Sequence, residues 1–125
     1  MRRRALIALA AGAASVAPAL ALADASSLPP KRYFVLAHTP GPNWDPTRSY
    51  REQTGIDQHV AYMQDFFDRG TLVLGGPFLD NSGGMMIFDL DSAQEAQRVA
   101  EADPTVKSGL LAVKVKPWLA IFREG

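Results

Sequence analysis

The chain has 125 residues, with thirteen Lys plus Arg, thirteen Asp plus Glu and no Cys. This length suits one compact domain. Without Cys the chain has no disulfides, so its stability must come from a packed core, and cysteine-based catalysis and thiolate metal sites are excluded.

The first 23 residues have the pattern of a secretory signal peptide. Arg2 to Arg4 form a positive start, Ala5 to Val16 is a run of small and apolar residues, and Ala21-Leu22-Ala23 suits a cleavage site. An uncleaved N-terminal anchor is the alternative, but an alanine-rich run broken by Pro18 makes a poor membrane span. We therefore expect cleavage near Ala23 and a periplasmic or secreted protein.

The mature chain should be slightly acidic. Removing 23 residues leaves 102, and losing three arginines leaves ten basic against thirteen acidic residues. No basic block remains, so we expect no nucleic-acid partner, and no membrane association after cleavage. Residues 24–31 are rich in Ser and Pro and predict a flexible leader to a domain spanning 32–125.

Hydrophobic periodicity predicts four strands and two helices in this domain. The expected strands are 33–38, 71–75, 85–90 and 111–122, and the expected helices are 56–69 and 92–102, the second ended by Asp103-Pro104. The order is βαββαβ, which is the ferredoxin-like α+β arrangement of an antiparallel sheet with two helices on one face. Residues 39–55 form a long loop, which is usually either functional or disordered.

The uncovered face of such a sheet predicts an oligomer. Two helices cover one face only, and the last strand places Trp118 and Phe122 on the other. An exposed apolar patch usually marks an interface, so we expect a homodimer that packs sheet to sheet.

His59 and Asp103 are the candidate catalytic residues. His59 lies one turn into the first helix, where the positive end of the helix dipole favours the neutral imidazole that a general base needs. A carboxylate such as Asp103 within reach would orient that imidazole. The structural alternatives are a semi-buried histidine bonded to backbone and an Asp-Pro that merely stops a helix. Sequence spacing alone does not show that the two residues meet.

The ordered set of motifs resembles the YCII-related (YciI-like) family, whose members have the dimeric α+β barrel fold. The set comprises His59, Gly75-Gly76-Pro77, Asp103-Pro104, Gly109 and Pro117-Trp118, and the resemblance spans residues 33–122. It implies that His59 and Asp103 are the active-site pair. One branch of this family eliminates chloride from a chlorinated hydroxyquinol, which the resemblance allows here.

Four residues are candidates for substrate binding, namely His38, Gly76, Pro77 and Trp118. Gly75 and Gly76 let a backbone approach a ligand closely, although a β-bulge is the favoured reading of this pair. His38 ends the first strand and either lines a pocket or caps the strand. In the long loop, Trp44 and Tyr50 together with Arg48 and Arg51 either cover a ligand or belong to a mobile surface loop.

No metal site or cofactor is predicted. The two histidines lie on different elements without an i,i+4 pair, and no Rossmann or P-loop fingerprint occurs. The leading hypothesis is a cofactor-independent lyase, dehydrohalogenase or isomerase that transfers protons on a small cyclic or aromatic molecule. The alternative is a non-enzymatic dimer that binds a small ligand.

Overall fold

The computed structural model describes residues 28–124, so the expected signal peptide, residues 1–23, lies outside the described residues. The described chain falls into two compact units, residues 28–31 with 119–124, and Arg32–Trp118. In the first unit Arg123 donates a hydrogen bond to the carbonyl of Pro29 (2.6 Å). Between residues 28 and 124, no helix is both long and apolar enough to cross a bilayer.

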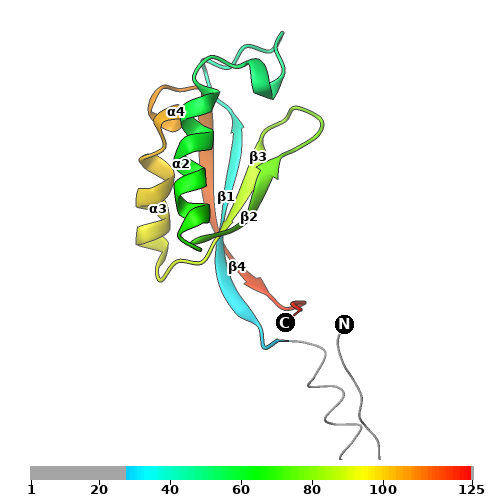
Figure 1. Ribbon diagram of the computed structural model, residues 1–125, viewed down its shortest axis with the longest axis vertical. Coiled ribbons are helices and arrows are strands. Elements are labelled where there is room, and N and C mark those ends of the chain that lie inside the picture. The colour runs from blue at the N-terminus through cyan, green and yellow to red at the C-terminus, as the bar shows by residue number, and fades with distance from the viewer. Residues whose placement is uncertain (1–27, 125) are drawn as a thin grey trace, which may run out of the picture. The chain divides into compact units, whose positions relative to one another are not determined.

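The strands form one antiparallel sheet in the order β2-β3-β1-β4 (Figure 1). The elements are β1 (Lys31–Pro40), the 3-10 helix η2 (Tyr50–Glu52), α2 (Ile56–Asp68), β2 (Leu72–Pro77), β3 (Gly84–Phe88), α3 (Ala93–Glu101), α4 (Pro104–Lys107) and β4 (Leu111–Ala120). The two main helices and four strands follow the βαββαβ order, which confirms the expected ferredoxin-like α+β fold.

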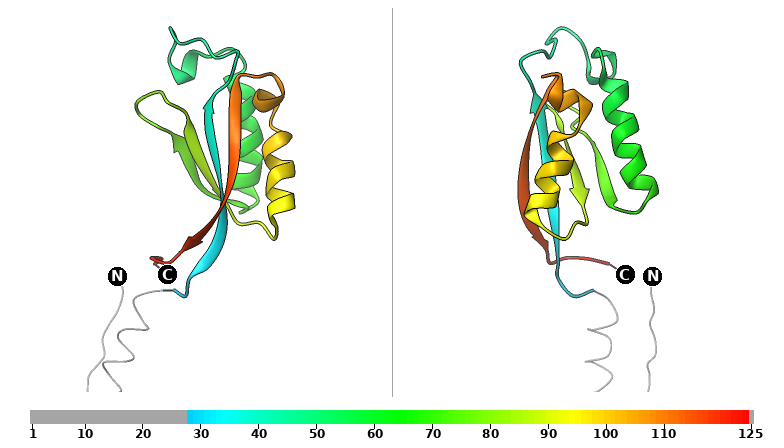
Figure 2. Two further views of the ribbon diagram at one scale, coloured as in Figure 1. Left: turned by 180° about the vertical axis from the view of Figure 1, so that it is seen from behind. Right: turned by 90° about the vertical axis from the view of Figure 1, so that its left-hand side faces the viewer.

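The helices cover one face of the sheet, as the ribbon seen from two further sides shows (Figure 2). Side chains alternate along β1, so Phe34, Leu36 and His38 are buried while the residues between them are only half-buried. Leu36 packs with Met63 of α2 and with a core of small and large apolar side chains that also includes Leu72, Met86, Phe88 and Ala100. The small Ala96 and Ala100, both fully buried, allow α3 to approach the sheet closely.

The short helix α4 was not expected from the sequence. Asp103-Pro104 does not simply end the second helix, because α3 already ends at Glu101 and Asp103 is the N-cap of α4, with Pro104 in its first turn. Asp followed by Pro suits an N-cap and first helical position, since the side chain accepts from a backbone N–H and Pro lacks the N–H that would be unpaired there. As this N-cap, the Asp103 side chain accepts a hydrogen bond from the backbone N–H of Thr105, and it is fully buried.

The expectation of a bulge at Gly75-Gly76 was wrong, because the register shift falls between Leu72 and Leu74, and Gly75 and Gly76 pair in regular register with Met86 and Met85. The expected loop over residues 39–55 is present with different bounds, since β1 continues to Pro40, and it contains the 3-10 helix η2 at residues 50–52.

Candidate active site

The structure brings His59 and Asp103 together, although 44 residues separate them in the chain. His59 Nδ1 lies 2.6 Å from Asp103 Oδ2, and both side chains are buried. An ionised carboxylate only accepts hydrogen bonds, so the proton lies on Nδ1 of His59. In the neutral imidazole, Nε2 is then the unprotonated nitrogen.

Thr105 holds the other carboxylate oxygen of Asp103. Its backbone N–H donates to Oδ1 at 2.9 Å and its hydroxyl donates to the same atom at 2.7 Å. Burial by itself would raise the pKa of Asp103, but the hydrogen bond and charge of His59 and the two bonds from Thr105 outweigh it and lower that pKa. Asp103 is therefore ionised at neutral pH even though it is fully buried.

His38 is the third polar side chain of the cluster. It ends the inward-facing row of β1, is 2% exposed, and its ring meets that of His59 edge-on with centroids 5.0 Å apart. Its Nε2 lies 3.8 Å from Asp103 Oδ2, which is too long for a hydrogen bond. Burial, and then the neighbouring His59, lower the pKa of His38 to about 4 against the opposing effect of Asp103.

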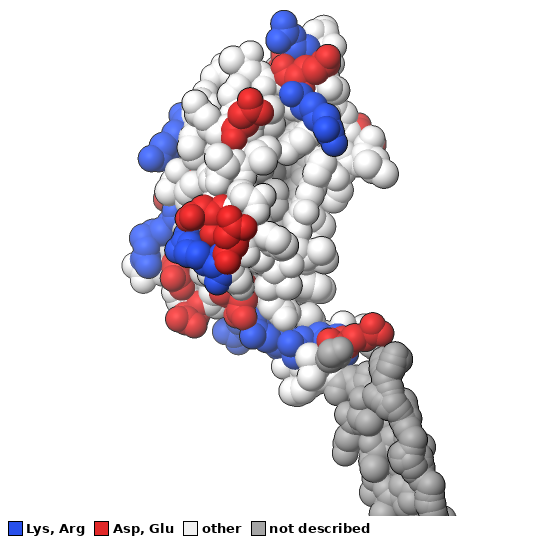
Figure 3. Space-filling model, viewed as in Figure 1, with Lys and Arg blue, Asp and Glu red and all other residues white. Residues whose placement is uncertain are grey.

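A cavity of about 270 Å³ opens beside His59, between α2 and the strands β2 and β3. Its lining is uncharged and mostly apolar: Tyr50, His59, Val60, Met63, Gln64, Phe67, Leu72, Leu74, Gly75, Gly76 and Met86. The space-filling view agrees, because the surface between α2 and the β2–β3 hairpin is largely free of charged side chains (Figure 3). Such a lining suits an apolar or aromatic ring with few polar groups.

A second, much smaller hollow of about 10 Å³ is lined by both histidines. Gly76 and Pro77, two of the predicted substrate-binding residues, line it together with His38. Trp118 does not join them. Alternation along β4 places it on the opposite face of the sheet, where its ring centroid lies 6.2 Å from that of Tyr33.

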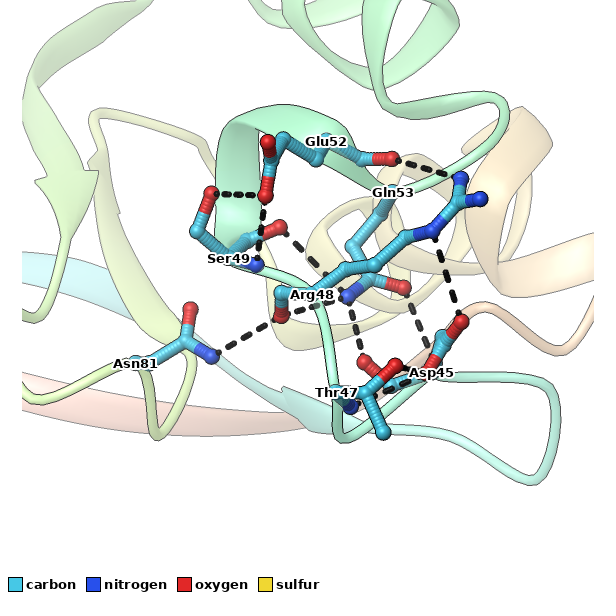
Figure 4. Close-up of polar contacts among 7 residues, drawn as sticks. All are labelled: Asp45, Thr47, Arg48, Ser49, Glu52, Gln53 and Asn81. Atoms are coloured by element: carbon cyan, nitrogen blue, oxygen red, sulfur yellow. Dashed lines mark hydrogen bonds and ion pairs between the residues drawn. The ribbon is translucent and has the colours of Figure 1, made fainter.

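The loop before α2 forms one wall of this site, and hydrogen bonds hold it in place. The buried Gln53 accepts a hydrogen bond from the backbone N–H of Asp45 (2.9 Å) and donates to the carbonyls of Asp45 (2.7 Å) and Arg48 (3.0 Å), as Figure 4 shows. Asn81 of the β2–β3 hairpin accepts from the backbone N–H of Tyr50 (2.8 Å). These bonds hold Tyr50 in place, where its side chain lines both the cavity and the small hollow.

Sequence reasoning missed two contributors to this geometry. Thr105 was not singled out, although a Thr two residues after an Asp N-cap is well placed to donate to the capping carboxylate. Gln53 carried no recognisable signal, because its role depends on carbonyls that only the folded loop brings together.

The arrangement is that of a small ferredoxin-like protein with a buried His-Asp pair, of which the histidine lines an apolar cavity. The chain belongs to the YCII-related domain family, whose model matches residues 33–119. Among curated proteins it is similar to the "Uncharacterized protein YjpA" of Bacillus subtilis (strain 168), with 38% identity over 65 residues, which is 49% of this chain and 76% of that protein.

A solved structure has the same fold. It is the 5-chloro-2-hydroxyhydroquinone dehydrochlorinase TftG of Burkholderia phenoliruptrix AC1100 in complex with 2,5-dihydroxybenzoquinone. The TM-score is 0.52 at 26% sequence identity, and the match covers 69% of this chain and 92% of that chain.

Proposed function

We propose that this protein is a cofactor-independent acid–base enzyme of the lyase, dehydrohalogenase or isomerase type. The observation that carries the proposal is the buried 2.6 Å contact between His59 and Asp103 beside an uncharged cavity. A histidine oriented by a carboxylate is a common general base, because the carboxylate selects the tautomer and stabilises the cation formed on proton uptake.

In the proposed reaction His59 Nε2 takes a proton from the bound ring. For an elimination, the leaving group then departs with the electron pair of its bond to the ring, so that the net change is the loss of HX. For an isomerisation, the imidazolium returns the proton at another position. In both cases Asp103 stays ionised and holds the imidazolium by the hydrogen bond to Nδ1.

We propose a small hydroxylated or quinone-like ring as the substrate. The cavity has no charged side chain, and Tyr50, Phe67 and Met86 offer apolar and aromatic surface to a ring. The similar TftG structure contains a dihydroxybenzoquinone, which favours the same ligand chemistry here.

The test compares the wild type with His59→Gln and Asp103→Asn on a set of halogenated and halogen-free hydroxyquinols. Ultraviolet absorbance and halide release measure turnover. Intrinsic tryptophan fluorescence measures binding, because one of the two Trp residues of the chain, Trp44, lines the small hollow. We expect both variants to bind ligand while turnover falls at least about a hundredfold. Saturable binding without turnover in the wild type, unchanged in His59→Gln, would instead identify a non-enzymatic binding module.

We propose that the chain forms a homodimer through the sheet face opposite α2 and α3. Tyr33, Val35 and Trp118 lie on that face, and Trp118 is 44% exposed. A face of this kind is usually covered by a partner. Sedimentation at micromolar concentration should give a dimer for the wild type and a monomer for Trp118→Glu, with the α2 surface variant Phe67→Glu as control. A monomeric wild type would contradict the proposal.

We also propose export with cleavage near Ala23, on the pattern of residues 1–23. Mass spectrometry of the protein recovered from the periplasm or medium should find a chain that starts at Asp24. A chain that still starts at Met1 would be evidence against cleavage.

A further inference from the structure

His38 presents an unexplained feature of the core. Its ring is buried, yet among the described residues neither Nδ1 nor Nε2 has a hydrogen-bond partner. Buried polar atoms are nearly always paired, and an exception usually indicates a bound water or ion or a functional role. A neutral imidazole left unpaired also carries the full cost of its desolvation.

The His38 ring lies next to two further side chains, a histidine and an aspartate, of the types that bind metal ions in proteins. One nitrogen of His38, one of His59 and one carboxylate oxygen of Asp103 lie within 4.8 Å of one another. Thr105 occupies Oδ1 of Asp103, and the other oxygen, Oδ2, lies 2.6 Å from His59 Nδ1 and 3.8 Å from His38 Nε2. The Thr105 bonds are of the kind that orients a metal-binding carboxylate from outside the ligand sphere.

We propose that His38, His59 and Asp103 bind one divalent transition-metal ion of the Zn²⁺ type. Two imidazoles and a carboxylate suit zinc, cobalt or nickel better than magnesium or calcium. Three protein ligands leave a fourth position open, as in catalytic zinc sites, and the hollow of about 10 Å³ beside both histidines is about the size of one water.

Metal binding requires the ligand atoms to rearrange. Metal bonds of about 2.0–2.2 Å place tetrahedral ligand atoms roughly 3.3–3.6 Å apart. The separation of 2.6 Å between His59 and Asp103 therefore has to open by roughly 0.7–1 Å, and the separation of 3.8 Å between His38 and Asp103 has to close by roughly 0.2–0.5 Å.

The metal would take the place of the proton shared by His59 and Asp103. The site then has two states, one with a proton for acid–base work and one with a metal in which His59 Nδ1 is a ligand. Loss of turnover on metal binding, reversed by a chelator, follows if the proposed function is right. The binding itself does not depend on that function.

The experiment is a titration of the untagged, chelator-treated chain with Co²⁺, because a polyhistidine tag would bind the probe. We expect one equivalent to bind with the visible absorption bands of four-coordinate Co²⁺, and Zn²⁺ to displace it. His38→Phe and Asp103→Asn should lose the bands, whereas Asp68→Asn, a change at an exposed carboxylate of α2, should keep them.

Two results would overturn the metal site. One is the absence of saturable absorption bands in the wild type, and the other is an identical spectrum and stoichiometry in His38→Phe. His38→Phe removes the two unpaired nitrogens at similar size, so its fold should persist, and circular dichroism checks this. A protein that binds Co²⁺ but turns over no substrate would refute the proposed function alone.

Discussion

Thr105 donates two hydrogen bonds to a single oxygen of Asp103, one from its backbone and one from its hydroxyl. Asp103 is fully buried, and Thr105 is 1% exposed. The hydroxyl therefore helps to orient the carboxylate that holds His59 and, together with His59 itself, helps to lower the pKa of Asp103.

Replacing Thr105 by Val should remove the hydroxyl without changing the shape of the side chain. The free energy of unfolding should fall by about 1–3 kcal/mol, because a buried carboxylate loses a hydrogen bond. The pKa of Asp103 should rise, since that bond helps to lower it. Urea denaturation at neutral pH measures the loss, and Thr105→Ser, which keeps the hydroxyl, is the control. Equal stability of Thr105→Val and wild type would mean that the hydroxyl contributes nothing.

Stability should depend on pH through His38. Its pKa is about 4 in the folded chain and 6.5 when unperturbed, so between these values the unfolded chain binds a proton that the folded chain does not. The free energy of unfolding should therefore be highest above pH 6.5 and decline as the pH falls toward 4, by about 3 kcal/mol at most.

Asp103 affects the pH dependence of stability only at lower pH. Its pKa is depressed below 3.8, so its contribution to the free energy of unfolding is lost only as the pH falls further. The measurement is the urea midpoint over roughly pH 4.5–7 in the presence of a chelator. This range covers most of the interval between the folded and unfolded pKa of His38, so the change in stability across it reports on that histidine. His38→Phe should flatten this dependence, and an unchanged slope in that variant would contradict the assignment.

Replacing Gly76 by Ala should leave the stability of the fold nearly unchanged but weaken ligand binding. A Cβ at Gly76 meets no atom within 4 Å, and Gly76 lines both the cavity and the small hollow. Gly76→Ala should stay within about 1 kcal/mol of wild-type stability and weaken ligand binding about tenfold.

The matched control is Gly84→Ala, whose Cβ would lie 2.6 Å from the carbonyl oxygen of Gly76 and 3.0 Å from Pro77 Cα. Backbone cannot yield as a side chain does, so this variant should lose stability. Thermal unfolding and ligand titration of the two variants test the contrast. If Gly76→Ala bound ligand as tightly as the wild type, Gly76 would not be part of the ligand site.

The loop before α2 should loosen when Gln53 is replaced by Leu. The backbone N–H of Asp45 loses its partner, and the carbonyls of Asp45 and Arg48 each lose one of their two hydrogen bonds, which should lower the local opening free energy by about 1–2 kcal/mol. Amide hydrogen exchange over residues 44–53 should become faster, and ligand affinity should fall because Tyr50 is less well held. Gln58→Leu, on the exposed side of α2, should leave exchange in this segment as in the wild type.

Local sequence patterns predicted the elements of this domain well. The helical spacing from Ile56 onward, the alternation along β1 and the cap at Ser92, which accepts a hydrogen bond from Glu95, all appear in the structure. Each depends on neighbours a few residues apart, so each is present in the linear chain. The short helix α4 was missed because one turn has too few residues to show a periodicity.

The sequence by itself determined the βαββαβ order and drew attention to His59 and Asp103 as the residues of interest. Only the tertiary structure decided that they meet and that Thr105 and His38 join them. The physical reason is that a hydrogen bond acts over about 3 Å, whereas the residues that it joins lie far apart in the chain, as do His59 and Asp103, which are 44 positions apart. Such contacts depend on how the helices pack on the sheet, and no local pattern in the chain records that packing.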